Sequence, residues 1–345
     1  MKETIKCAVL GLGRLGYWHA ENLATKVQGA ELVKVIDPLT GRAEQVAKEL
    51  GVKNWSQNPD EAFMDEEIDA VVIVTPTSTH AEMIKKAANH KKHVFVEKPL
   101  TQNLEEAGEV IQTLDESGTF CQVGFMRRFD PAYVEAKKRI VAGDIGKPLY
   151  FKGVSRDGNV PHEDFIKHSG GIFLDVAIHD YDIARFLMED EVDSIQCTGN
   201  ILLESNSFMK KYDDVDQGLS TIRFKSGAAG DIETMRVAPY DGYDIRGEVI
   251  GTEGAIQIGS MRQQDIRIFS NNKSGYDLVA DFPTRFANAY LLEIVHFIDS
   301  LRKDEEPSST ARDGKKALEI AYAGTKSFST GETVLLRNLS LTNSI

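Results

Sequence analysis

The stretch Ile5-Lys-Cys-Ala-Val-Leu-Gly-Leu-Gly-Arg-Leu-Gly16 decides the fold of this 345-residue chain. It opens with a short apolar run typical of a buried strand, and three glycines in GxGxxG spacing follow at once. The next residues have a helical pattern ending near Val27, and a second strand, 31–36, leads into Asp37. An acid roughly 20 residues beyond the last glycine is typical of a dinucleotide-binding βαβ unit. The sequence therefore predicts that unit.

The three glycines have distinct physical roles in such a loop. Gly11 permits the tight turn, Gly13 lets a pyrophosphate approach the backbone, and Gly16 lets helix and strand pack closely. The helix N-terminus then faces the phosphates. Asp37 can accept hydrogen bonds from both ribose hydroxyls and would repel a 2′-phosphate, so we expect NAD rather than NADP. Arg42 is a possible partner for a 2′-phosphate, which leaves NADP open as the alternative.

Strands continue to alternate with helices as far as residue 123. Apolar runs at 68–74, 93–96 and 120–123 indicate strands, and helical patterns at 81–90 and 104–116 separate them. This alternation predicts a parallel, doubly wound sheet, which binds ligands at the carboxyl ends of its strands. The candidate cofactor-binding residues lie in the glycine loop or at those ends: Gly11, Gly13, Arg14, Leu15, Gly16, Asp37, Thr75, Pro76, His80, Glu97 and Lys98.

From Gly124 onward the pattern changes to strands without intervening helices. The expected strands are 149–154, 194–203, 218–224, 228–235, 245–250, 255–258 and 265–270. They predict an α+β domain with a large, mainly antiparallel open sheet. We thus expect an α/β Rossmann domain at 1–123 and a substrate-binding and oligomerisation domain at 124–345.

A pair of polar residues occurs in the stretch Gly170-Gly-Ile-Phe-Leu-Asp-Val-Ala-Ile-His-Asp-Tyr-Asp182. Its apolar positions predict one buried helix, which would place Asp175 and His179 side by side on one face. An imidazole beside a carboxylate suits proton abstraction. Lys98, directly after a buried strand, offers an ammonium group that can stabilise an oxygen losing its proton. A solvated or structural side chain is the alternative at each of these three positions.

Composition excludes several classes of protein. The formal net charge of −13 argues against nucleic acid and anionic membranes as partners. We find no apolar run of transmembrane length and no signal-peptide core after Met1. Cys7, Cys121 and Cys197 are scattered without metal-ligand spacing. We expect a cytoplasmic protein with reduced thiols and no metal.

Three motifs together resemble the Gfo/Idh/MocA oxidoreductases over essentially the whole chain. They are the GxGxxG loop, Glu97-Lys98-Pro99, and the Gly-Gly pair followed by Asp175-x-x-x-His179-Asp-x-Asp182. The resemblance implies a nicotinamide-dependent enzyme acting on sugars, cyclitols or their relatives. It also implies that Lys98, Asp175 and His179 form the catalytic set, and that the C-terminal sheets pair into dimers and often tetramers. We therefore expect a homotetramer.

A narrower resemblance concerns Gly124-Phe-Met-Arg-Arg-Phe-Asp130, which is similar to the inositol dehydrogenases of that family. It implies oxidation of a ring hydroxyl of myo- or scyllo-inositol to the keto-inositol with NAD. The candidate substrate-binding residues are Met126, Arg127, Asp157, Asn159, Tyr243 and Tyr290. Two alternatives stay open: a dehydrogenase of another sugar or cyclitol, and a non-catalytic NAD-binding sensor. The sensor is disfavoured because the catalytic set is intact and no basic helix-turn-helix is visible.

Overall fold

The computed structural model describes residues 2–236, 240, 242–259 and 261–339, which form two compact units. The first unit comprises residues 2–129 and 288–316, and the second comprises 130–287 and 317–339. The stretch 288–316 groups with the first unit because the later part of helix α10 (Phe282–Lys303) buries Ile294 and Phe297 in its core. The division expected at residue 123 assigned this stretch to the other domain.

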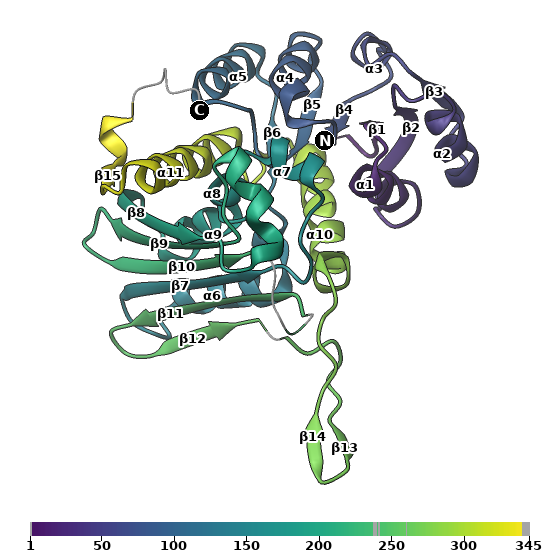
Figure 1. Ribbon diagram of the computed structural model, residues 1–345. Coiled ribbons are helices and arrows are strands. Elements are labelled where there is room, and N and C mark those ends of the chain that lie inside the picture. The colour runs from purple at the N-terminus through teal and green to yellow at the C-terminus, as the bar shows by residue number, and fades with distance from the viewer. Residues whose placement is uncertain (1, 237–239, 241, 260, 340–345) are drawn as a thin grey trace. The chain divides into compact units, whose positions relative to one another are not determined.

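The first unit is built on a six-stranded parallel sheet (Figure 1). Its strands are β1 (Ile5–Leu10), β2 (Ala30–Ile36), β3 (Asn54–Ser56), β4 (Ala70–Ile73), β5 (His93–Glu97) and β6 (Cys121–Gly124). They lie in the order β3-β2-β1-β4-β5-β6, which is the Rossmann order. The predicted doubly wound sheet is confirmed. Strand β3 was not predicted from the sequence. Two of its three residues are exposed, so it lacks the apolar run that marks a buried strand.

Helices connect these strands, as the alternation predicted. They are α1 (Arg14–Thr25), α2 (Arg42–Leu50), α3 (Asp60–Phe63), α4 (His80–Asn89) and α5 (Leu104–Ser117), with a 3₁₀ turn η1 (Thr77–Thr79) before α4. Helix α5 shows why its ends fall where they do. The side chain of Asn103 accepts a hydrogen bond from the backbone N–H of Glu106 (2.9 Å), and Gly118 ends the helix at φ +68°.

The second unit contains a seven-stranded sheet in the order β12-β11-β7-β10-β9-β8-β15. The bounds are β7 (Pro148–Arg156), β8 (Val192–Asn200), β9 (Gln217–Phe224), β10 (Ala229–Met235), β11 (Asp244–Gly251), β12 (Ala255–Ile258) and β15 (Val334–Leu335). Neighbours are antiparallel except β7 and β10, so the predicted mainly antiparallel sheet is confirmed. The strand expected at 265–270 is instead part of a separate hairpin, β13 (Ile268–Ser270) and β14 (Lys273–Gly275), which extends away from this sheet (Figure 1).

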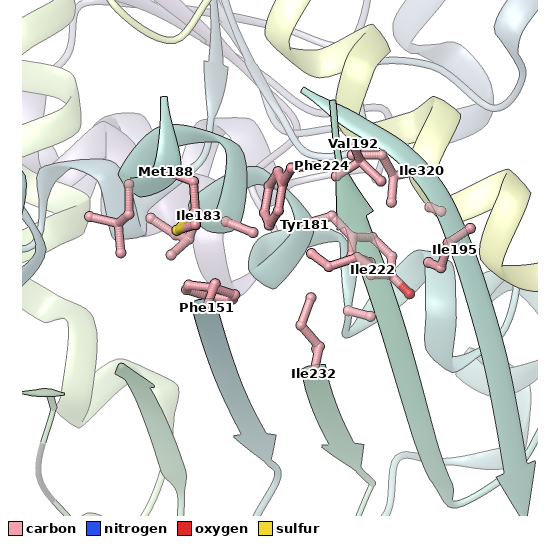
Figure 2. Packing of buried hydrophobic residues seen from close by; sticks show 14 of the residues in the cluster. Phe151, Tyr181, Ile183, Met188, Val192, Ile195, Ile222, Phe224, Ile232 and Ile320 are labelled. Carbon is pink, nitrogen blue, oxygen red and sulfur yellow. The ribbon is translucent and has the colours of Figure 1, made fainter. Parts of the chain in front are cut away.

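Helices cover one face of the seven-stranded sheet. In β9 buried and exposed residues alternate, so Ile222 and Phe224 share the core face while Arg223 does not. Figure 2 shows Phe151 and Ile232 of neighbouring strands in the same cluster as Tyr181. The helices of this unit are α6 (Pro131–Ala142), α7 (Glu163–Ser169), α8 (Ile172–Asp175) and α9 (Ile178–Met188), together with residues 282–287 of α10 and 317–330 of α11 (Ala311–Thr330). Its 3₁₀ turns are η3 (Glu204–Tyr212) and η4 (Leu336–Asn338). No helix among the described residues combines the length and apolarity needed to cross a bilayer.

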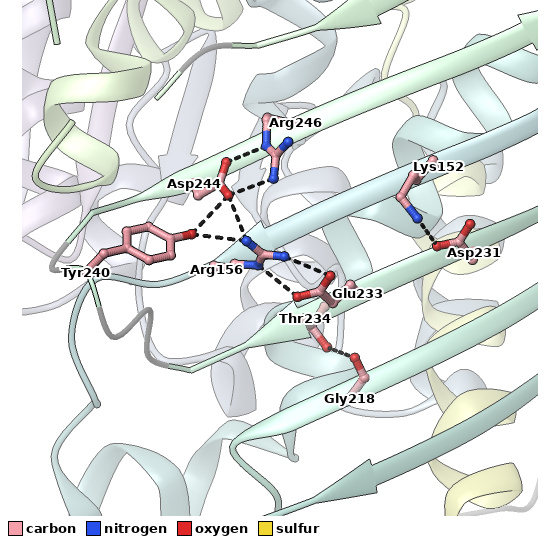
Figure 3. Close-up of polar contacts among 9 residues, drawn as sticks. All are labelled: Lys152, Arg156, Gly218, Asp231, Glu233, Thr234, Tyr240, Asp244 and Arg246. Carbon is pink, nitrogen blue, oxygen red and sulfur yellow. Dashed lines mark hydrogen bonds and ion pairs between the residues drawn. The ribbon is translucent and has the colours of Figure 1, made fainter. Parts of the chain in front are cut away.

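The opposite face of the sheet carries an ion-pair network (Figure 3). The guanidinium of Arg156 binds both carboxylate oxygens of Glu233 (2.8 and 2.9 Å) and lies 3.3 Å from Asp244. The hydrogen bonds that Arg156 donates to Glu233 raise the pKa of Arg156. Arg246 also binds Asp244 (2.7 Å), so two arginines share one buried carboxylate. The part of this face around Arg156 is therefore polar and cross-linked between strands.

Candidate active site

The glycine loop between β1 and α1 has the backbone that a dinucleotide requires. Gly11 has φ +86°, and a Cβ there would lie 2.6 Å from the carbonyl oxygen of Val74. A Cβ on Gly16 would lie 1.9 Å from the Gly11 carbonyl oxygen. A Cβ on Gly13 would meet nothing within 4 Å. Gly11 and Gly16 are thus fixed by packing, whereas Gly13 leaves open space beside the loop.

The start of α1 faces that open space. Its first intrahelical hydrogen bond runs from the N–H of Tyr17 to the carbonyl of Gly13 (2.9 Å), so earlier backbone N–H groups project from the helix end. No side chain caps this end, Arg14 is exposed and Leu15 is half-buried. An uncapped, accessible helix N-terminus is suited to bind a pyrophosphate.

Asp37 follows β2 and is held by the glycine loop itself. Its Oδ2 accepts a hydrogen bond from the N–H of Leu12 (2.7 Å), and its Oδ1 accepts one from the N–H of Leu39 (2.9 Å). Each carboxylate oxygen retains a further acceptor site for a ribose hydroxyl. The Nε of Arg42 donates to the carbonyl of Leu12 (2.9 Å). Asp37, expected to favour NAD, and Arg42, the possible partner of an NADP phosphate, are thus both hydrogen-bonded to the backbone of Leu12.

His80 joins the segments that follow β4 and β5. Its Nδ1 lies 2.9 Å from the carbonyl oxygen of Pro99, and its Nε2 lies 3.0 Å from that of Thr75. Burial lowers the pKa of His80, which favours a neutral ring with one N–H that donates to one carbonyl at a time. Thr75 is also fixed by a hydroxyl contact with Thr79 (2.7 Å), and Pro76 precedes this turn. His80 therefore supports the two strand ends on which the candidates Thr75 and Lys98 lie.

Glu97 is the last residue of β5, and the half-buried Lys98 follows it. The Oε1 of Glu97 accepts a hydrogen bond from Nε2 of His19 on α1 (2.8 Å). On the neighbouring strand, a Cβ at Gly124 would lie 3.0 Å from the Glu97 carboxyl group. The Glu97 side chain is thus enclosed, at the strand end where Lys98 begins.

Asp175 and His179 do not lie in one regular helix, and that prediction is wrong. Asp175 ends α8, and His179 is the second residue of α9. Between them the N–H of Ala177 binds the carbonyl of Ile172 (3.0 Å), and the N–H of Asp180 binds the carbonyl of Ala177 (2.9 Å). The first of these hydrogen bonds spans five residues and the second spans three. Together they interrupt the regular α-helical pattern, in which each bond spans four residues.

Arg236 is a functional candidate that no sequence motif identified. It is fully buried, and its guanidinium lies 3.0 Å from Asp175 and 2.9 Å from Asp214. Burial alone would lower the pKa of Arg236, but the charges of Asp175 and Asp214 outweigh it and raise that pKa, with Asp157 adding to the effect. The one available signal was a charged residue directly after the predicted strand 228–235.

The six substrate-binding candidates are distributed over both units. Met126, Arg127 and Tyr290 belong to the first unit, and Asp157, Asn159 and Tyr243 belong to the second. Met126 and Arg127 are buried in the turn η2 (Met126–Phe129), and Tyr290 lies 6.0 Å from His19 between ring centroids.

The second-unit candidates are closer to one another. A Cβ on Gly158 would lie 3.8 Å from the backbone nitrogen of Tyr243, so the loop with Asp157 and Asn159 runs beside Tyr243. The Tyr243 ring packs edge-on against Phe286. Lys98 belongs to the first unit, whereas Asp175 and His179 belong to the second.

A Rossmann unit with an open phosphate loop and an acid after its second strand is typical of proteins that bind a nicotinamide dinucleotide. Residues 5–125 match the model of the oxidoreductase family, NAD-binding Rossmann fold, and residues 137–336 match the family's C-terminal alpha/beta domain. The chain belongs to the Gfo/Idh/MocA family of oxidoreductases, and its first unit is an NAD-binding domain.

Similar proteins are named as inositol dehydrogenases. The chain is 56% identical to the scyllo-inositol 2-dehydrogenase (NAD(+)) of Bacillus subtilis, with 97% of each chain covered. It is 37% identical to the myo-inositol 2-dehydrogenase of Thermotoga maritima, covering 97% of this chain and 99% of that one. The solved scyllo-inositol dehydrogenase of Lactobacillus casei with bound NAD(H) and scyllo-inositol matches with a TM-score of 0.91 and 31% identity. That match covers 97% of this chain and 100% of the other.

Proposed function

We propose that this protein oxidises a ring secondary alcohol of scyllo- or myo-inositol to the keto-inositol, with NAD as hydride acceptor. The observation that carries the proposal is the 56% identity, over nearly the full length, to a scyllo-inositol 2-dehydrogenase. The open glycine loop at Gly13 and the uncapped start of α1 support NAD as the cofactor.

In the proposed mechanism His179 takes the hydroxyl proton as general base. Lys98 donates a hydrogen bond to the same oxygen and stabilises the negative charge that develops on it. Asp175 orients His179, and Arg236 in turn fixes Asp175 (3.0 Å). NAD, when bound by the glycine loop, would supply the acceptor for the hydride that leaves the ring carbon.

Substrate recognition is assigned to the six candidates named above. Arg127 offers several N–H donors, and Asp157 and Asn159 offer acceptors, which together suit a ring with many hydroxyl groups. The contact of the Asp157 loop with Tyr243 supports a shared role for these two segments. Met126 and Tyr290 would supply less polar contacts to the same substrate.

The test is NAD reduction with scyllo-, myo- and chiro-inositol and glucose supplied separately, and with NADP run in parallel. We expect turnover of an inositol with NAD and much slower turnover with NADP. Turnover of glucose alone would assign the protein to another sugar substrate. Silence on all four, with NAD still bound, would contradict catalysis and favour a sensor.

We also propose a homotetramer that pairs through the outer faces of the C-terminal sheets. That face carries exposed Leu219 and Ile250 as well as the Arg156 network, a mixture of apolar and paired polar groups typical of protein interfaces. Light scattering on the purified protein should give the mass of four chains. A monomer at micromolar concentration would contradict the proposal.

A cytoplasmic location completes the proposal. The three cysteines are all buried free thiols, which suits a reducing compartment. Cell fractionation should recover the protein with cytoplasmic enzymes, and recovery outside the cytoplasm would contradict this location.

A further inference from the structure

Three buried ionisable side chains of the first unit have no part in the mechanism above. His19 of α1 and Glu293 of α10 are fully buried, and Glu97 of β5 is 8% exposed. One nitrogen of the ring and one oxygen of each carboxyl group lie within 4.8 Å of one another. Nε2 of His19 is 2.8 Å from Oε1 of Glu97 and 4.0 Å from Oε1 of Glu293. We call these three residues the buried acid cluster.

The hydrogen bonds of the cluster indicate its charge. Among the described residues, the two carboxyl oxygens of Glu293 have no hydrogen-bond partner, and the Nδ1 atom of His19 has none either. A doubly protonated His19 would bury an unsatisfied N–H at Nδ1, so the geometry favours a neutral ring that donates from Nε2 to Glu97. Two ionised carboxylates beside a neutral imidazole would bury two uncompensated negative charges, which is very costly.

Either a cation or a proton can remove that cost. A divalent metal could be bound by two carboxylates and one imidazole. However, the 2.8 Å contact between Nε2 of His19 and Oε1 of Glu97 is a direct hydrogen bond. Its proton lies where a metal ion bound to Nε2 would have to lie. A proton on Glu293 instead creates a donor beside the Glu97 carboxylate, and it leaves a single negative charge in the cluster.

We propose that Glu293 is a neutral carboxylic acid at neutral pH, and that its proton leaves a single negative charge, that of Glu97, in the cluster at the end of β5. Burial raises the pKa of Glu293 well above its ordinary value, and the charge of Glu97 raises it further. The inference goes beyond the proposed dehydrogenase activity and does not depend on it.

The other groups around Glu293 leave this assignment unchanged. Gln122 of β6 is uncharged and donates from Nε2 to the backbone carbonyl of Glu293 (2.8 Å). Tyr290 and His296 lie on α10 itself, and Lys98 follows Glu97 along the chain. Of the charged groups on the packed elements, Glu97 is the one whose charge acts on the pKa of Glu293.

The proposal fixes the sign of a pH effect. Because the folded-state pKa of Glu293 is raised, the stability it contributes is fully present below the ordinary pKa and is lost as pH rises toward the raised value. Glu293→Gln keeps a neutral side chain of similar size but does not titrate. The melting temperature of Glu293→Gln minus that of wild type should therefore grow steadily from about pH 5 to about pH 8.

The experiment compares melting temperatures of the wild type, Glu293→Gln and the control Glu116→Gln across this pH range. Glu116 is exposed on α5 and accepts a hydrogen bond from the side chain of Gln112 (2.8 Å), so its variant should follow the wild type. The wild type at pH 8 should also show the infrared carbonyl band of a protonated carboxylic acid, and Glu293→Gln should lack it.

The two readouts need no catalytic activity, so they separate this proposal from the proposed function. The proposal is overturned if the melting temperature of Glu293→Gln minus that of wild type stays constant or falls as pH rises. Absence of the infrared band in the wild type would also overturn it. One equivalent of bound metal, lost in Glu293→Gln, would show that a cation rather than a proton neutralises the cluster.

Discussion

The carboxylate of Asp175 is held by Arg236, a residue no motif pointed to. The guanidinium lies between Asp175 and Asp214, and the side chain of Arg236 is fully buried. Burying such an ion pair costs solvation energy that offsets its attraction. The pair therefore contributes to the site by fixing the position of Asp175 rather than by adding stability. Arg236 fixes both the charge and the direction of a carboxylate that we assign to orienting His179.

Arg236→Met should destabilise the protein by about 3–5 kcal/mol, because it leaves the buried carboxylate of Asp214 and the half-buried carboxylate of Asp175 without their cation. Denaturant unfolding measures this loss. Arg139→Met is the matched control, because Arg139 is exposed and pairs with Glu135 on the surface of α6; it should cost at most about 1 kcal/mol. Equal effects of the two substitutions would argue against a structural role for Arg236.

His179→Ala and Lys98→Met should each lower kcat by about 10²–10⁴-fold, the range typical of a lost general base or oxyanion donor. NAD affinity, measured by titration calorimetry on the same samples, should stay near the wild-type value. His168→Ala, at an exposed position on α7, should leave kcat unchanged. Near-wild-type turnover in both site variants would refute the assignment.

At the scale of elements, the loop between β1 and α1 was the most predictable part of the molecule. The predicted roles of Gly11, Gly13 and Gly16 reappear as a positive φ, an open space and a close backbone contact. Local sequence determines this loop because each role depends on the absence of a side chain. The segment carrying Asp175 and His179 was less predictable, because the interruption between α8 and α9 leaves the apolar pattern intact.

The glycine loop yields a contrast between two alanine substitutions. Gly13→Ala should fold with near-wild-type stability, because its Cβ meets nothing within 4 Å, but it should weaken NAD binding at least about tenfold by obstructing the pyrophosphate. Gly16→Ala should destabilise the fold itself, since its Cβ would lie 1.9 Å from the Gly11 carbonyl oxygen. Thermal unfolding and NAD titration measure the two effects. Equal loss of stability in both variants would contradict these roles.

At the scale of the whole molecule, sequence alternation predicted both sheets but not how distant segments join them. The first unit takes in the part of α10 that buries Ile294 and Phe297, and this helix follows the first unit's last strand by more than a hundred residues. The apolar pattern of α10 predicts a buried helix but does not indicate which of the two hydrophobic cores it joins. The same limit hid the buried acid cluster, because Glu293 reaches His19 and Glu97 only through that long-range packing.

Arg236 illustrates the same limit in the second unit. It follows β10, whereas its partner Asp175 ends α8, and their contact depends on tertiary structure. Motif spacing located the candidates Lys98, Asp175 and His179 because each lies in a short local pattern. The residues that support them lie elsewhere in the chain, so a local pattern could not reveal them.

The most direct test of the central claim follows the hydride itself. The purified protein is mixed with NAD and scyllo-inositol that carries deuterium on its ring carbons, and the NADH formed is analysed by mass spectrometry and NMR. Direct transfer from the ring carbon to the cofactor predicts one deuterium at C4 of the nicotinamide in every NADH. NADH without deuterium, or no NADH while NAD and inositol are both bound, would contradict the account.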